Sequence, residues 1–258
     1  MGSKSGVEGG IDRIAPTLRP DRWTAMRQIW RHVLFLHWRV PPERLLPLLP
    51  PGLELDVYDG EAYVGLIPFT MAGVRPALCP PIPFLSSFHE TNVRTYVHVG
   101  GRDPGVWFFS LDASSTPAVV GARALMNLPY FRARIDMTVG PDGPTIDYQL
   151  RRRWPGPKSA ACDVRYAPRG PVSPAVPGSL EHFLVERYIL YHVVRGRLHR
   201  ARVHHAPWPL QGADVSMRHE SLTAAAGIDR PDGPPLIHYG REVRVEIFGT
   251  ERVGRPED

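Results

Sequence analysis

The stretch SSTPAVVGARALMNLPYFRARI, residues 114–135, predicts a helix followed directly by a strand. Ser115 or Thr116 can cap the helix, and Pro129 ends its helical spacing. The residues that follow alternate between apolar and arginine or other polar side chains, as in a half-buried strand. Tyr130 therefore lies where a helix meets a strand, and we expect a functional side chain at this junction.

The composition favours strands and turns over long helices. Proline accounts for 29 of the 258 residues, about twice its usual share of ~5%. Because proline breaks helices and central strands, many short strands joined by rigid turns are expected. The chain is long enough to bury a substantial core, and its hydrophobic content of 43% is ordinary for a globular protein.

The excess of basic over acidic residues does not indicate nucleic-acid binding. The net charge is +5, and Lys4 and Lys158 are the only lysines among 31 basic residues. A bias in nucleotide composition explains this, since Ala, Gly and Pro are abundant as well. A nucleic-acid surface predicts basic runs interleaved with aromatics, and the single run RRRW at residues 151–154 is too short for one.

Neither a membrane nor an oxidising compartment is indicated. Cys79 and Cys162 are the only cysteines, too few for a disulfide framework or a zinc cluster. No apolar stretch reaches the ~18–20 residues of a membrane helix, and the first residues lack the apolar core of a secretory signal. We therefore expect a cytoplasmic protein.

The order of predicted elements indicates one β-rich α+β domain at residues 21–250, between a flexible arm at 1–20 and a frayed tail at 251–258. Asp59-Gly60 and Pro141-Asp142-Gly143-Pro144 predict hairpin turns. No repeated βαβ alternation and no glycine-rich phosphate loop is seen. Besides the strand that follows Pro129, the predicted strands are residues 23–38, 53–58, 62–71, 88–99, 106–112, 146–150, 164–166, 198–205 and 241–247, and a second helix is predicted at 180–192.

The predicted strand at residues 88–99 carries the clearest candidate site. Glu90, Asn92 and Arg94 share one face, and the other face holds only Thr and Val. Two interpretations remain open for the polar face. It either meets water, or it lines the interior of a barrel as the wall of a ligand pocket.

The second helix places Arg187 and Tyr188 on or beside its apolar stripe. A guanidinium buried alone costs several kcal/mol, so Arg187 must either extend to solvent or find a partner. The partner is a carboxylate such as Glu90, or an anionic ligand.

Five of the eleven histidines lie between His182 and His205. His199 and His205 on one strand face allow a metal site or an acid–base pair. However, no His-Glu-x-x-His motif is present and nearby acidic residues lack ligand spacing, so structural histidines are favoured and no metal is predicted.

Six blocks in a particular order resemble the YqjF-like family of largely uncharacterised bacterial proteins. They are VPPERLLPLLPPGLELDVYDGEAYVGLIPF, FHETNVRTYV, GVWFFSLDAS, LPYFRA, ERYILY and HHAPWPL. The resemblance runs from about residue 30 to residue 247. That family is similar in fold to acetoacetate decarboxylase, a curved antiparallel sheet rolled into a cone-like β-barrel around a central pocket, with few short helices. The resemblance therefore supports the pocket-wall interpretation.

The resemblance also implies site residues and excludes one reaction. In the decarboxylases a carboxylate follows an aromatic at the start of one strand, as Glu90 does here. A helix carrying an arginine, matched by Arg123, leads to a pair of lysines, the first of which forms the Schiff base. Tyr130 and Phe131 fill those two positions. Because a phenol does not condense with a ketone, Schiff-base decarboxylation is excluded.

The leading hypothesis is a small-molecule pocket for a carbonyl or carboxylate compound. In this hypothesis the protein catalyses an acid–base reaction of the lyase, hydratase or isomerase type and needs no cofactor. The alternative is a non-catalytic binding or sensor protein, and a homo-oligomer is left open. An arginine beside Glu90 would keep it ionised and lower its pKa, whereas burial would raise the pKa and make Glu90 a general acid near neutral pH; we expect the arginine to prevail. The expected catalytic residues are Glu90 and Tyr130, and the expected ligand-binding residues are Asn92, Arg94, Arg123, Arg187 and Tyr188.

Overall fold

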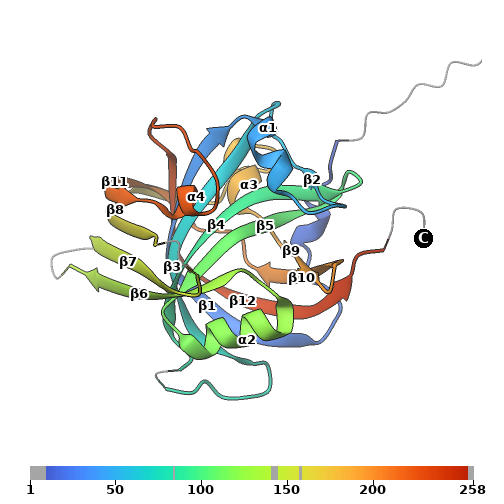
Figure 1. Cartoon of the computed structure of the whole chain (residues 1–258), viewed down its shortest axis with the longest axis horizontal. Coiled ribbons are helices and arrows are strands. Elements are labelled where there is room, and N and C mark those ends of the chain that lie inside the picture. Colours follow the sequence, from blue (N-terminus) through green and yellow to red (C-terminus); the bar gives the residue numbers. More distant parts are fainter. Residues whose placement is uncertain (1–9, 84, 141–144, 157–158, 255–258) are drawn as a thin grey trace, which may run out of the picture.

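The computed structural model describes residues 10–83, 85–140, 145–156 and 159–254, and these form one large sheet with a few short helices (Figure 1). The strands are β1 (Thr24–Val40), β2 (Glu54–Leu55), β3 (Ala62–Pro76), β4 (Phe88–Val99), β5 (Arg102–Ala113), β6 (Tyr130–Val139), β7 (Ile146–Trp154), β8 (Ala161–Ser173), β9 (Ile189–Val194), β10 (Arg197–His205), β11 (Leu210–Glu220) and β12 (Leu236–Arg252). The helices are α1 (Pro42–Leu45), α2 (Thr116–Met126), α3 (Leu180–Val185) and α4 (Leu222–Ala225), with short 3-10 helices η1 (Ala15–Thr17) and η2 (Leu46–Leu48).

The sheet closes on itself, as the expected cone-like fold requires. Its order is β10-β9-β5-β6-β7-β8-β11-β12-β1-β3-β4-β2, and further pairings join β10 to β12 and β4 to β5. Neighbouring strands are antiparallel except at β5, which runs parallel to β6 and to β9. The parallel step from β5 to β6 is made by α2, because such a connection needs a crossover segment. The turn predicted between β6 and β7, at residues 141–144, lies outside the described residues.

The opening stretch folds as its sequence predicts. Ser115 caps α2, where its hydroxyl accepts a hydrogen bond from the N–H group of Ala118. Asn127 ends the helix in the left-handed conformation with φ of 50°, which asparagine tolerates better than most residues. Tyr130 begins β6 three residues later, so the helix delivers this side chain to the edge of β5.

Two hydrophobic cores lie on opposite sides of β1, β3 and β4. Because side chains alternate along a strand, each of these strands contributes to both cores. In β4, Val93 packs in the first core and Tyr96 in the second. In β1, Leu34 belongs to the first core and Phe35 to the second. The candidate site lies within the second core, so the central strands are buried on both faces.

One local prediction was wrong, and another was confirmed only for its turn. The helix expected at residues 180–192 ends at Val185, and the chain continues into β9, which pairs with β10 and β5. The β-branched residues of β9 suit a strand better than a helix. The hairpin at Asp59-Gly60 is limited to one bridge between Tyr58 and Glu61, since β2 pairs with β4 rather than with β3.

Both ends of the described chain contact the sheet. Within the segment expected to be a flexible arm, Arg13 forms an ion pair with Asp56, and Arg19 with Glu246. At the other end β12 runs to Arg252. Among the described residues, no helix has both the length and the apolar character needed to cross a membrane.

Candidate functional site

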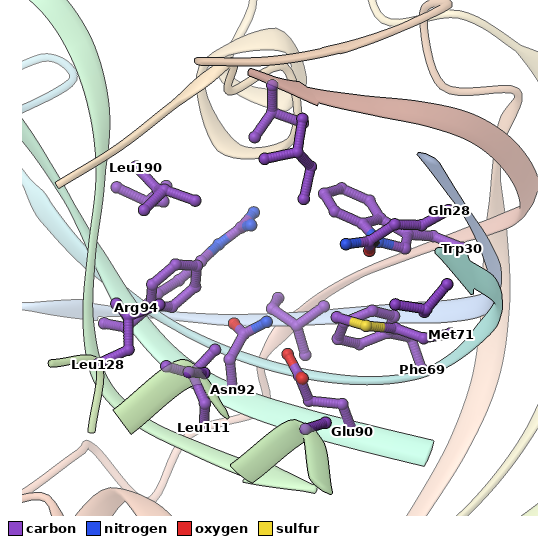
Figure 2. A pocket seen from close by; sticks show the side chains of 18 of the residues that line it. Gln28, Trp30, Phe69, Met71, Glu90, Asn92, Arg94, Leu111, Leu128 and Leu190 are labelled. Atoms are coloured by element: carbon purple, nitrogen blue, oxygen red, sulfur yellow. Dashed lines mark hydrogen bonds between the residues drawn. The ribbon is translucent and has the colours of Figure 1, made fainter. Parts of the chain in front are cut away.

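A cavity of about 390 Å³ occupies the second core (Figure 2). Its walls come from β1, β3, β4, β5, β9, β10, β12 and the start of β6, and α2 covers one side. Most of the lining is apolar, including Trp30, Phe35, Phe69, Met71, Phe88, Phe108 and Leu111. The polar and titratable lining residues are Gln28, Glu90, Asn92, Arg94, Tyr130, Arg187 and His205.

Strand β4 supplies three of these polar groups, because every second side chain of the strand faces the cavity. Glu90, Asn92 and Arg94 point toward the cavity and are all buried, with exposed fractions of 1%, 5% and 9% (Figure 2). Thr91, between them, faces the other way and hydrogen-bonds the hydroxyl of Tyr148 at 2.8 Å. The polar face of this strand is therefore a pocket wall and does not meet bulk solvent.

The carboxyl group of Glu90 and the phenol of Tyr130 form a buried pair. The Tyr130 hydroxyl donates to Glu90 Oε2 at 2.9 Å. Burial raises the pKa of Glu90 to about 8, the nearby carboxyl of Asp112 adds to this rise, and the hydrogen bond from Tyr130 opposes it. Burial also raises the pKa of Tyr130 well above its usual value. Glu90 is thus mainly protonated at neutral pH.

The expectation that an arginine would lower the pKa of Glu90 was wrong. Arg94 lies on the same strand face, but four residues along an extended strand span about 13 Å. Its Nη2 donates instead to the carbonyl oxygen of Leu184 at 3.0 Å, and its guanidinium lies over the rings of Phe35 and Tyr96. Without a close cation, the desolvation of Glu90 decides its pKa.

Further along β4 from Glu90, buried polar atoms remain without partners. Asn92 Oδ1 and Arg94 Nε have no hydrogen-bond partner among the described residues. Such atoms are uncommon in protein interiors, because leaving a buried polar group unpaired costs ~1–3 kcal/mol. Glu90 Oε1 and Arg94 Nη1 also make no hydrogen bond with the described part of the chain. Together these groups can hydrogen-bond a bound molecule.

Arg123, expected at the site from the resemblance, lies outside the cavity. It is exposed on α2, where it donates to the backbone carbonyl of Tyr130 at 2.8 Å and lies over the ring of Trp154. Residues such as Ala118 and Ala122 take the cavity side of this helix, and the helical period turns Arg123 away from it. Arg123 therefore supports the backbone that carries Tyr130.

Arg187 and Tyr188, expected to bind ligand, have partners within the protein. Arg187 reaches the cavity wall, but its guanidinium pairs with Asp56 at 2.8 Å and bonds the Phe183 carbonyl at 2.7 Å. Its expected pairing with Glu90 is not formed. Tyr188 donates to Glu186 and stacks on His205 with ring centroids 4.5 Å apart, and it is not among the lining residues.

Of the five described histidines between His182 and His205, His205 is the one that lines the cavity. Its Nδ1 lies 2.8 Å from the carbonyl oxygen of Ala206, which only accepts, so this nitrogen carries the proton. Burial lowers the pKa of His205 to about 4, and the ring is neutral at pH 7. The described residues contain no cluster of three or more His, Cys, Asp or Glu side chains that could hold a metal.

Gln28 and Trp30 were missed because β1 contains an irregularity. Trp30 Nε1 donates to Gln28 Oε1 at 2.8 Å, and both side chains face the cavity. Because Gln28 and Trp30 are two residues apart and both face the cavity, strand alternation predicts that His32 faces it as well. The next residue of β1 that lines the cavity is instead Val33. His32 adopts φ of 53°, and the pairing of β1 with β3 shifts register beyond Arg31. This bulge reverses the faces of β1, and the alternation of residues 29–37 gave no sign of it.

Comparisons with known proteins agree with this architecture. The sequence profile of the DUF2071 family, an uncharacterized conserved protein, matches residues 27–244. The uncharacterized protein YqjF of Bacillus subtilis (strain 168) is 42% identical over 226 residues, which cover 88% of this chain and 91% of that protein.

Two solved structures show the likeness of fold. The acetoacetate decarboxylase of Legionella pneumophila aligns with a TM-score of 0.64 at 13% identity over 100% of both chains. The enduracididine biosynthesis enzyme MppR, complexed with pyruvate, aligns with a TM-score of 0.62 at 15% identity over 91% of this chain and 92% of that one. The chain therefore belongs to the DUF2071 family and has the fold of the acetoacetate decarboxylase-like proteins.

Proposed function

We propose that the cavity binds a small carbonyl or carboxylate compound and that Glu90 exchanges a proton with the carbon next to the ligand's carbonyl group. The protein would then be an acid–base enzyme of the lyase, hydratase or isomerase type. One observation carries the proposal: a buried carboxyl group, held by Tyr130 at 2.9 Å through one oxygen, keeps its other oxygen unpaired in a cavity.

The chemistry follows from this geometry. Ionised Glu90 takes a hydrogen from the α carbon: a C–H bond breaks, an O–H bond forms on Oε1, and the electron pair moves into the carbonyl to give an enolate. Returning the proton completes the exchange. With a pKa of about 8, Glu90 is a stronger base than an ordinary glutamate and is half ionised near pH 8. Tyr130 positions this carboxyl group.

The guanidinium of Arg94 and the side-chain amide N–H group of Asn92 are the donors that would hold a ligand's carboxylate. Arg94 brings a buried positive charge whose Nη1 makes no hydrogen bond with the described residues. Guanidinium groups bind carboxylates through short, charge-assisted hydrogen bonds. The structural neighbour MppR was solved with pyruvate, a small oxo acid, and this supports the choice of compound class.

The proposal excludes a Schiff-base intermediate. The resemblance matches Tyr130 and Phe131 to the lysine pair of the decarboxylases, and neither side chain forms an imine. Lys4 and Lys158, the two lysines of the sequence, lie outside the described residues and match no block of the resemblance.

The second candidate function is non-catalytic ligand binding. The observation that favours it is the largely apolar lining of the cavity. A binding or sensor protein needs no proton transfer, so its ligand would leave the cavity with its C–H bonds unchanged.

Exchange of the pyruvate methyl hydrogens in D₂O, followed by proton NMR, separates the two candidates. The protein should accelerate exchange, and Glu90→Gln should lower the rate by about 10²–10⁴-fold. Glu43→Gln, which alters an exposed glutamate of α1, is the matched control and should keep the parent rate. If Glu90→Gln retains the parent rate, the catalytic role of Glu90 is wrong. If pyruvate binds without accelerated exchange in any variant, the binding function is favoured.

A further inference from the structure

Resting on the proposed function, we infer that the ligand is an oxo acid with a bulky apolar group, such as an aryl ring, and not a three-carbon acid. The cavity has three regions in succession: the proposed anion-binding groups, the reactive carboxyl group and an aromatic wall.

The order of groups along the wall carries the inference. Figure 2 shows Glu90 between Asn92 and Arg94 on one side and Phe69, Met71 and Trp30 on the other. A carboxylate bound at Arg94 and Asn92 places the neighbouring carbonyl and α carbon toward Glu90. The rest of the molecule then extends to the apolar side.

The apolar side is a rigid aromatic surface. The rings of Trp30 and Phe69 meet edge to face with centroids 5.8 Å apart, and Trp30 also stacks on Trp208 at 6.3 Å. Gln28 fixes the indole of Trp30 through the hydrogen bond to Nε1. Aromatic rings held in this way favour an apolar or aromatic ligand group in edge-to-face or offset contact.

The size of the cavity exceeds what a three-carbon acid would fill. A volume of about 390 Å³ lies in the range of pockets that enclose ligands of drug size, roughly 300–1,000 Å³. A pyruvate-sized molecule at Arg94 would leave water against Trp30, Phe69 and Met71, which is unfavourable for apolar surface. A larger apolar group would displace that water.

Helix α2 leaves this space open by carrying small residues. Ala118, Gly121 and Ala122 line the cavity, and a Cβ atom added to Gly121 would meet no other atom within 4 Å. A larger side chain here would occupy volume without displacing protein atoms. Gly121 therefore offers a substitution that fills the cavity.

Calorimetric titration with pyruvate and with 4-phenyl-2-oxobutanoate tests the inference. Each buried methylene contributes about fourfold in affinity, so a benzyl group that buries the equivalent of about three to four methylenes should make the phenyl acid bind on the order of 100-fold more tightly than pyruvate. Trp30→Ala should reduce this advantage at least tenfold, while the affinity for pyruvate changes less. Equal affinities for the two acids would overturn the inferred ligand class.

A second test fills the cavity with the substitution Gly121→Leu. Ala124→Leu, on the exposed side of α2, is its control. Leucine favours a helix over glycine, so the first variant should fold. Gly121→Leu should abolish the preference for the phenyl acid, and Ala124→Leu should retain it. An unchanged preference in Gly121→Leu contradicts the inference.

The two proposals fail in different ways. If pyruvate exchange depends on Glu90 while the phenyl acid binds no better than pyruvate, the ligand class is wrong and the proposed function stands. If the phenyl acid binds tightly but neither acid exchanges its α hydrogens, the proposed catalysis is wrong and the size preference stands.

Discussion

The hydroxyl of Tyr130 donates a 2.9 Å hydrogen bond to Glu90 Oε2, joining the first residue of β6 to the third residue of β4. The two side chains are 40 residues apart in sequence and are both buried. This bond stabilises the ionised form of Glu90, whereas burial stabilises the neutral form. The state of Glu90 near neutral pH depends on the balance between them.

Tyr130→Phe should raise the pKa of Glu90 above about 8, because the donor that opposes the effect of burial is removed. The rate of pyruvate exchange should then begin to rise at a higher pH than in the parent protein. A profile of exchange rate against pH, with both proteins at equal concentration, measures the shift. A shift to lower pH would show that Tyr130 does not stabilise the carboxylate.

The contribution of Glu90 to the stability of the fold should fall as the pH rises from about 4.5 to 8. In the unfolded chain Glu90 ionises at its ordinary pKa, but in the folded protein it stays neutral until about pH 8. Its contribution is therefore fully present at low pH and lost at ~1.4 kcal/mol per pH unit across this window.

Denaturant unfolding of the parent and of Glu90→Gln at several pH values isolates this effect. The glutamine variant should gain stability relative to the parent as the pH rises, since it has no proton to lose. A constant difference between pH 5 and pH 8 would mean that Glu90 has an ordinary pKa.

Arg94→Met should weaken the binding of oxo acids by at least about tenfold, because it removes the buried cation proposed to hold the carboxylate. Calorimetric titration with 4-phenyl-2-oxobutanoate measures the loss. Arg197→Met, which alters an exposed arginine of β10, is the control and should bind like the parent. Equal affinity for the parent and Arg94→Met would place the ligand's carboxylate elsewhere.

Asp56→Asn should destabilise the fold by about 3–5 kcal/mol, because it leaves the buried guanidinium of Arg187 without its charged partner. Thermal unfolding measures the change in Tm. At a temperature where the variant is folded, oxo-acid binding should match that of the parent. Lost binding with unchanged stability would instead make Arg187 a ligand-binding residue.

Strand β4 was predictable because its residues follow a simple period of two. Val93 and Tyr96 enter different cores, as the alternation predicts, and Glu90 and Asn92 face the cavity. The sequence alone left solvent and pocket open for this face. The neighbouring strands that bury it are distant in sequence, so only the family resemblance pointed to a pocket.

Three features could not be predicted because tertiary contacts decide them. The bulge at His32 reverses the faces of β1 through a register shift against β3. The segment after Val185 becomes a strand because β10 and β5 pair with it. Arg187 pairs with Asp56, which is 131 residues away. No local pattern of side chains encodes such partners.

The most direct test of this account is the pKa of the Glu90 carboxyl group. Carbon-13 NMR of protein labelled at the glutamate side chains, titrated with pH and compared with Glu90→Gln, identifies its signal by difference. The account predicts a midpoint near pH 8. A midpoint near the ordinary glutamate value of about 4.5 would contradict it, because Glu90 would then be fully ionised at neutral pH and no stronger a base than a glutamate in water.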